Sequence, residues 1–378
     1  MKPKRVWRVA AILLGLAAGA AAASPAPLAD RDLDARARAA IARGLDWLQR
    51  NQATNGCWSN PQFPALTALP LWGVCGARDP SRASMADRAT AFLLTCVQTN
   101  GGIYVNIPGR RGGGLANYNT AICLTALHAT GRKDLTRVVL DARAFIAGSQ
   151  HFGDDVYAGG FGYDRETQRA YTDLDNTMFA LEAMRRTQNA EDLRPAGEKR
   201  ADVDWKAALA YVGKLQNPPA AGTNDMGGFF YNPDDPKAGL VTNAAGRVFL
   251  RSFGSITYAG LLSMVYAEVT RADPRVQSAL DFAARHWTLE ENPGMGSQGL
   301  FFYYDVMSRA LSAGRVDAIP RRDGADIRWR EELARKLVAL QKPDGSWANA
   351  DNRFWENDPV LATAYALVAL ENAVGLEP

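Results

Sequence analysis

Two kinds of hydrophobic pattern alternate along this chain. One is amphipathic and is clear in residues 36–50, where apolar residues recur at helical spacing and charged residues fall elsewhere. The other is apolar almost all round and occurs in residues 65–74, 121–129, 178–184, 258–267 and 360–370. A helix that is apolar on every side must be buried on every side. Because no alternation typical of strands competes, the pattern predicts an outer ring of amphipathic helices around an inner ring of buried ones.

A short signature joins the two kinds of helix. It consists of a helical run, usually a glutamine, a glycine-containing turn and a large apolar residue, and it occurs at residues 47–58, 96–103, 148–161, 214–229 and 339–347. Recurrence at this scale is typical of a repeat architecture. We interpret each glycine as part of a helix C-cap in the left-handed conformation, and we expect Trp58 and Trp347 to fold back onto the preceding helix.

A threonine falls at one register of the apolar helices, at Thr67, Thr120, Thr177, Thr257 and Thr363. We attribute it to packing, because a hydroxyl inside a buried helix can bond the carbonyl four residues earlier. The last interval is twice the first, which leaves room for one more pair, formed by residues 276–287 and 298–311. Six pairs predict an all-α fold, an (α/α)6 toroid. One longer interval holds an insertion at residues 217–247, which is either a lid or a surface decoration.

The first 23 residues have the features of a secretory signal. A basic start precedes an apolar run, and Ala21 and Ala23 offer a cleavage site before Ser24. We therefore expect export to the periplasm or the extracellular space, with residues 24–378 forming one domain. The whole chain has a net charge of +3, and the signal holds four basic residues and no acid, so the remainder has a net charge of −1. This balance argues against a nucleic-acid partner.

Export makes the four cysteines candidates for disulfides. Cys57 and Cys96 each lie beside a glycine turn of adjacent repeats, which places them at the same end of the structure. A Cys57–Cys96 bridge is one interpretation, and isolated buried thiols are the other. The second is favoured for Cys75 and Cys123, which lie in apolar helical runs.

Two of the turns resemble a known motif. Gln52, Gly56 and Trp58, and likewise Gln341, Gly345 and Trp347, are spaced as in the QW repeats of the squalene-hopene cyclase and protein prenyltransferase superfamily. The stretches 252–268, 286–304 and 358–372 resemble exported, uncharacterised prenyltransferase and squalene oxidase repeat proteins. The resemblance covers residues 31–376 and implies a toroid around a central apolar cavity.

The resemblance to cyclases implies a candidate acid. These enzymes protonate a polyene with the middle Asp of a D-x-D-D motif, and residues 171–177 read YTDLDNT. Asp173 and Asp175 match the first two acids, whereas Asn176 replaces the last and removes a hydrogen-bonding partner expected to tune the acid. The alternative is that Asp173 and Asp175 open a helix, where carboxylates cap free N–H groups and complement the dipole.

A prenyltransferase zinc site is not expected. Asp305 matches the Asp of that site, but Met307 stands where the family has Cys, and residues 359–370 contain no His. The three histidines, His128, His151 and His286, are scattered over three units and are expected at helix ends or in loops. The sequence therefore predicts no metal and no cofactor.

Carbohydrate enzymes also use (α/α)6 toroids, with paired carboxylates beside a cleft and aromatic platforms for sugars. Asp173 or Asp175 could pair with Asp305 or Asp358 for this purpose. The candidate platforms are Tyr163, Tyr231, Tyr303, Tyr304 and Trp355.

The remaining candidate is Arg251, which with Tyr258 leads into the fourth apolar helix after the insertion. It could grip an anionic group of a ligand or pair with a nearby acid. The predicted ligand-binding set is Asn176, Arg251, Tyr258, Tyr303, Tyr304, Asp305 and Trp355.

Three functions remain open on the sequence. The first is an exported terpenoid cyclase-like or prenyltransferase-like toroid that binds an isoprenoid or lipid in its cavity, with catalysis by Asp175 in doubt. The second is a non-catalytic scaffold for a protein partner. The third is an enzyme that acts on a polysaccharide, since a polymer substrate suits an exported protein.

Overall fold

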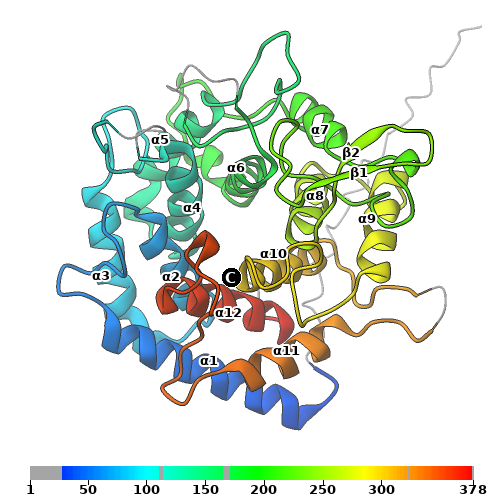
Figure 1. Ribbon diagram of the computed structural model, residues 1–378. Helices are drawn as coiled ribbons and strands as arrows, with labels where there is room; N and C mark the ends of the chain where they lie inside the picture. Colours follow the sequence, from blue (N-terminus) through cyan, green and yellow to red (C-terminus); the bar gives the residue numbers. More distant parts are fainter. Residues whose placement is uncertain (1–27, 110–113, 165–170, 322–323, 377–378) are drawn as a thin grey trace, which may run out of the picture.

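The chain folds into two concentric rings of helices, as Figure 1 shows for the computed structural model, which describes residues 28–109, 114–164, 171–321 and 324–376. Within these residues the outer ring is α1 (Arg31–Asn51), α3 (Ala83–Thr95), α5 (Thr136–Ala147), α7 (Trp205–Lys214), α9 (Pro274–Arg285) and α11 (Trp329–Leu340). The inner ring is α2 (Ala65–Gly76), α4 (Ala116–Ala129), α6 (Leu174–Arg186), α8 (Gly254–Tyr266), α10 (Leu300–Ala313) and α12 (Pro359–Ala373). Each inner helix packs against the next, and α12 packs against α2 to close the circle. The predicted (α/α)6 toroid is confirmed.

Burial separates the rings as the hydrophobic pattern predicted. In α12 every residue from Val360 to Ala373 is buried, whereas α1 buries one stripe that includes Leu33, Ile41 and Leu48. Short 3-10 helices lie in the connections: η1 (Pro80–Arg82), η2 (Lys133–Leu135), η3 (Gln188–Leu193), η4 (Pro219–Ala221) and η5 (Arg353–Trp355). No helix among the described residues combines the length and apolarity needed to cross a membrane.

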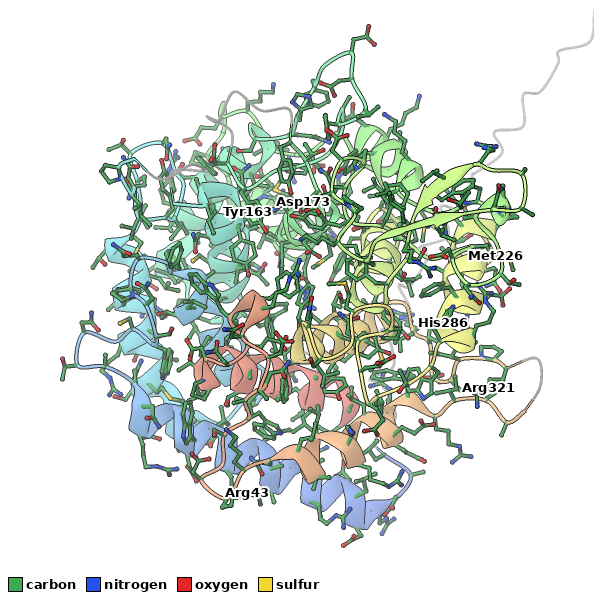
Figure 2. The ribbon with its side chains drawn as sticks, in the orientation of Figure 1. Arg43, Tyr163, Asp173, Met226, His286 and Arg321 are labelled. Atoms are coloured by element: carbon green, nitrogen blue, oxygen red, sulfur yellow. The ribbon has the colours of Figure 1, made fainter. Side chains whose placement is uncertain are left out.

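The glycine turns join neighbouring outer helices. Gly345 has φ +97°, and a Cβ on it would lie 2.5 Å from the carbonyl oxygen of Arg43 in α1. Gln341 completes this joint, because its amide donates to the carbonyls of Ala40 at 2.8 Å and Gly345 at 2.9 Å. Figure 2 shows Arg43 where α1 passes the loop that follows α11. The last turn therefore docks on the first helix and closes the outer ring.

The C-cap interpretation of these glycines is wrong, although the positive φ is correct. Helix α1 ends at Asn51 and its C-cap is Gln52, in extended backbone, before the turn that contains Gly56. Gly56 has φ +89°, and a Cβ on it would lie 2.2 Å from the carbonyl oxygen of Arg88 in α3. The glycine is required because the turn approaches the backbone of the next outer helix closely.

The threonine register ties five of the turns to the inner helices that follow them. Five backbone N–H groups from the turns donate to the threonine hydroxyls: Trp58 to Thr67, Ile103 to Thr120, Phe161 to Thr177, Phe229 to Thr257 and Trp347 to Thr363. The predicted bond to the carbonyl four residues earlier is also present in Thr177, at 2.7 Å, and Thr257, at 2.8 Å. The hydroxyl therefore acts as both donor and acceptor where a turn meets a helix.

The indoles of the QW-like turns fold back as predicted. Trp58 donates its Nε1–H to the carbonyl of Leu48 at 2.8 Å, and Trp347 donates to that of Leu337 at 2.9 Å. Both tryptophans are fully buried.

The insertion contains strands that the sequence did not predict. Strands β1 (Leu240–Thr242) and β2 (Val248–Leu250) form an antiparallel hairpin in which Leu240 pairs with Leu250. Each strand has only three residues and none of them is buried, so neither is long enough to show the alternating pattern of a half-buried strand.

The Cys57–Cys96 bridge, one of the two interpretations of these cysteines, is not formed. All four cysteines are free thiols, and the Cys96 sulfur instead contacts the carbonyl oxygen of Phe92 at 3.7 Å. The histidines lie at helix ends or in loops as expected: His128 in the last turn of α4, His151 in a loop and His286 at the C-cap of α9. The predicted signal, residues 1–23, lies outside the described residues.

Candidate functional site

A buried ion network fills the middle of the ring. Arg309 of α10 pairs with Asp305 at 2.6 Å and with Glu182 of α6. Glu182 also accepts bonds from the Tyr266 hydroxyl at 2.9 Å and from Arg186 at 3.1 Å. The two carboxylates and Arg309 are almost completely shielded from solvent. The network therefore occupies the centre at the level of the middle of the inner helices.

A cavity of about 220 Å³ lies above this network, where the inner helices begin. Its wall is mostly aromatic and aliphatic: Phe63, Ala65, Leu66, Leu115, Tyr118, Tyr163, Phe179, Phe253, Phe302, Phe354, Trp355, Leu361 and Tyr365. The other lining residues are Asp175, Lys237, Ser255, Asn292, Gly299 and Glu356. Phe354 and Trp355 are 42% and 46% exposed, so they mark the mouth. The guanidinium of Arg309 lies 5.4 Å from the Phe179 ring, which places the network directly below the cavity.

Asp175 is the acid that the fold presents to this cavity. It lies in the first turn of α6, and its Oδ1 is buried with no hydrogen-bond partner among the described residues. Burial raises the pKa of Asp175 to about 7, and the charge of Asp173 adds to this increase. The charges of Lys237 and Arg309 act in the opposite direction. A carboxyl group with this pKa exists in both protonation states near neutral pH.

Asp173 has a different role from Asp175. It is the N-cap of α6, where Oδ1 accepts from the backbone N–H of Asn176 at 2.8 Å and Oδ2 accepts from its amide at 2.7 Å. Burial raises the pKa of Asp173, while these bonds lower it. Figure 2 shows Asp173 beside Tyr163 near the inner face of the ring. Asn176, which stands at the position of the third acid, thus bonds Asp173. Asp175 is left to face the cavity.

Glu356 is the second carboxylate on the wall, but it is committed to a helix end. Its oxygens accept the backbone N–H groups of Phe301 at 3.2 Å and Phe302 at 2.7 Å, at the start of α10. The amide of Asn349 donates a third bond at 2.8 Å. Burial raises the pKa of Glu356, and these bonds lower it. Glu356 therefore resembles a buried capping group more than a free acid.

Lys237 is the cation on the wall, and sequence reasoning did not single it out. It comes from the insertion and is half-buried, with Nζ 3.0 Å from the centroid of the Tyr231 ring and 5.5 Å from that of Phe354. Burial lowers the pKa of Lys237, while the charges of Asp175 and Asp173 raise it. The insertion is therefore more than surface decoration, because it completes the wall of the cavity.

Of the predicted ligand-binding residues, Trp355 lies on the cavity wall, packed edge-on against Phe63 with ring centroids 5.1 Å apart. Tyr303 and Tyr304 do not line it. Their hydroxyls donate to the carbonyls of Thr288 and Leu289, at 3.0 and 2.5 Å, and so hold the fifth turn, which lacks the threonine.

The other predicted residues also lie outside the described wall. Tyr258 is buried against Tyr303, with ring centroids 5.9 Å apart. Asp305 belongs to the ion network, and Asn176 bonds Asp173. Arg251 lies beyond the hairpin, 45% exposed, with its guanidinium 3.9 Å from Asp225. The ion-pair interpretation of Arg251 therefore describes its position better than a ligand contact.

Most of the carboxylates predicted as pairs for a carbohydrate enzyme already bond other groups of the protein. Asp173 and Asp358 cap α6 and α12, and Asp305 pairs with Arg309. No group of three or more His, Cys, Asp or Glu side chains suited to a metal ion occurs in the described parts of the chain.

A sequence signal for the wall did exist. The residue two positions before each register threonine lines the cavity: Ala65, Tyr118, Asp175, Ser255 and Leu361. These positions lie in the first turn of the five inner helices that carry the threonine, on the side that faces the ring axis. The threonine register thus marks the cavity as well as the joints.

Comparison with known proteins supports the fold. No protein-family model and no curated protein matches the sequence. A variant of the type II terpene cyclase MstE from Scytonema is similar in structure, with a TM-score of 0.58 and 14% identity over 92% of this chain and 100% of that one. A further variant was solved with its substrate, geranylgeranyl dihydroxybenzoate (TM-score 0.56, 14% identity, 92% and 100% coverage).

The GH76A α-1,6-mannanase from Salegentibacter is also similar, with a TM-score of 0.57 and 12% identity over 90% of this chain and 100% of that one. An inactive variant of it was solved with α-1,6-mannotriose. A protein from Actinoplanes matches with a TM-score of 0.52 and 16% identity over 89% and 99% of the two chains. At these identities the similarity shows a shared (α/α)6 toroid.

Proposed function

We propose that this toroid binds an isoprenoid or similar apolar chain in its cavity and that Asp175 protonates a carbon–carbon double bond of that chain. The observation that carries the proposal is the Asp175 carboxyl group on an aromatic wall, with a pKa of about 7 and an oxygen that has no hydrogen-bond partner among the described residues. A general acid works best when its pKa lies near the operating pH. The proposal includes kinship with the terpene cyclases, on the resemblance of the QW-like turns and of YTDLDNT.

The wall suits the chemistry that follows such a protonation. The proton moves from the Asp175 carboxyl to an alkene carbon, which leaves a carboxylate and a carbocation. The rings of Tyr118, Phe179, Phe302 and Tyr365 line the cavity, and aromatic rings can stabilise a cation through their quadrupoles. Another double bond of the chain then attacks the cation and closes a ring, and loss of a proton to water restores a neutral product.

The volume indicates the size of the chain. A dry apolar cavity of about 150 Å³ holds a benzene ring, so the observed 220 Å³ accommodates roughly nine carbon atoms by proportion. A ten-carbon prenyl chain is therefore a suitable first probe, and a longer chain would extend through the mouth beside Phe354 and Trp355.

The proposal also includes export through residues 1–23, so that the ligand is met outside the cytoplasm. The mass of the protein recovered from the periplasm or medium tests this, since cleavage after Ala23 leaves Ser24 as the first residue. A full-length mass would contradict cleavage at that site.

The decisive experiment compares Asp175→Asn with wild type on ten-carbon and longer prenyl substrates, with products analysed by gas chromatography and mass spectrometry. Asn keeps the shape of the side chain but cannot donate an acidic proton, so binding should persist while cyclised product disappears. Asp154→Asn, an exposed change in a loop, is the matched control. Unchanged turnover in Asp175→Asn would exclude the acid role, and failure of every prenyl chain to bind would exclude the ligand class.

A polysaccharide enzyme has less support in the geometry. Three of the four carboxylates considered for it cap helices or form the ion network, and the wall is mostly aromatic and aliphatic. Binding of α-1,6-mannotriose in the same assay, without binding of prenyl chains, would reverse this ranking.

A further inference from the structure

Within the described parts of the chain, the ammonium of Lys237 has no ionic partner in contact with it. It is half-buried at the mouth of an apolar cavity, and its close contacts are the rings of Tyr231 and Phe354. No carboxylate among the described residues lies within ion-pair distance of it. Burying a charge costs free energy unless an opposite charge compensates it, so the Lys237 ammonium is a cation that lacks a counter-ion.

The backbone around Lys237 is held in place. Asn232, which is fully buried, donates from its amide to the carbonyl of Thr172 before α6 and accepts the N–H of Asp234 at 2.7 Å. The N–H of Lys237 itself donates to the carbonyl of Asp235 at 2.9 Å. The ring of Tyr231 supports the ammonium from one side. Lys237 is thus positioned over the cavity before any ligand arrives.

We propose that the ligand of this cavity carries an anionic group, a carboxylate or a phosphate, and that Lys237 binds this group at the mouth while the apolar chain enters the aromatic cavity. The inference rests on the proposed function, because it uses the same cavity and assigns the polar end of the same ligand. Either anion supplies the acceptor oxygens that an ammonium group needs.

The charges around Lys237 couple this anion to the acid. The groups that act on Lys237 are Asp175, Asp173, Asp235 and Arg353, and those that act on Asp175 are Lys237, Asp173 and Arg309. An anion on Lys237 offsets the positive charge that favours ionised Asp175. Anion binding should therefore be accompanied by proton uptake at Asp175, and by reciprocity it should strengthen as the pH falls. In this arrangement the ligand itself helps to protonate its acid.

The test measures binding of three ten-carbon probes by calorimetry at pH 6: geranic acid, geranyl monophosphate and the neutral alcohol geraniol. A charge-assisted bond should make at least one anion bind about 10- to 100-fold more tightly than geraniol. The proteins are wild type, Lys237→Met, which keeps the length of the side chain, and Lys342→Met, an exposed lysine of the last turn as the control. Lys237→Met should remove the preference for the anion, and Lys342→Met should retain it. The tighter of the two anions identifies the headgroup.

Titrations of the anion in two buffers of different ionisation enthalpy measure the accompanying proton. Uptake should occur near pH 7 in wild type and disappear in Asp175→Asn, a result that a structural role of Lys237 would not produce. Equal affinities for geraniol and both anions, or a preference that survives in Lys237→Met, would overturn this inference and leave the apolar cavity intact. Failure of all three probes to bind would overturn both this inference and the proposed function.

Discussion

Substitution of Gly345 by alanine should weaken the joint that closes the ring. Gly345 has φ +97°, and the added Cβ would lie 2.5 Å from the carbonyl oxygen of Arg43, far inside a normal contact. A non-glycine residue in this backbone region costs about 1–3 kcal/mol. The overlap with α1 adds an overpacking cost of about 1–3 kcal/mol, because the turn or the helix must move.

The two costs can be separated with a matched glycine. Gly197 has φ +91°, but a Cβ on it would meet no atom within 4 Å, so Gly197→Ala carries the conformational cost alone. We expect Gly345→Ala to lower the free energy of unfolding by about 2–6 kcal/mol and Gly197→Ala by about 1–3 kcal/mol. Urea unfolding followed by circular dichroism gives both values.

The difference between the variants is the quantity that matters. If Gly345→Ala costs no more than Gly197→Ala, the close approach to Arg43 contributes nothing, and the account of the turns as joints is wrong. Hydrogen exchange gives a second reading, because displacement of the turn from Ala40 and Arg43 should raise exchange in α1 before it does so in α6.

Three further predictions concern buried charges. Burial raises the pKa of Glu371 well above its usual value, so as the pH rises this carboxyl group ionises in the unfolded chain before it does so in the folded one, and the free energy of unfolding falls. Glu371→Gln should therefore be more stable than wild type at pH 8 and nearly equal to it at pH 4. Equal stability of the two proteins at pH 8 would refute this. Arg309→Met leaves the buried Asp305 without its ion-pair partner and removes one of the two arginines that pair with Glu182, so it should cost about 3–5 kcal/mol of unfolding free energy, against less than about 0.5 kcal/mol for the exposed Arg200→Met; similar losses would refute a role for the network. Lys237→Met removes a positive charge that lowers the pKa of Asp175, so the midpoint for Asp175 in a pH profile or carboxyl NMR titration should move above about 7; a downward shift would contradict the assignment.

The sequence was sufficient to predict the fold, because the local periodicity of apolar residues shows which helices are buried on one side and which on all sides. All-round apolar helices must lie inside, and the threonine register fixed the number of pairs even where the fifth turn is degenerate. The hairpin in the insertion was not predicted because its strands are three residues long and none of their residues is buried, which is too little for a strand pattern in the sequence.

The site was harder to predict, because the hydroxyl of a tyrosine can bond either a ligand or a backbone carbonyl. Tyr303 and Tyr304 look like platforms, yet their hydroxyls bond the carbonyls of Thr288 and Leu289. Lys237 lies in the insertion, which is not part of the repeats, so the repeat pattern could not predict its position. Asp175 was found through its resemblance to a motif, but only the structure separates it from Asp173, which caps the same helix.

The contact between the last turn and the first helix has a consequence for how the molecule unfolds. In an open repeat array each unit contacts only its neighbours, so the terminal units fray and unfolding can proceed one repeat at a time. Here Gln341 bonds Ala40, and Arg38 bonds the carbonyl of Val374, so the terminal pairs are covered like any other. A closed ring offers no free end from which to unravel, and the loss of any one pair exposes two neighbours and the cavity between them. The toroid should therefore unfold as one cooperative unit, with its stability held collectively by all six pairs.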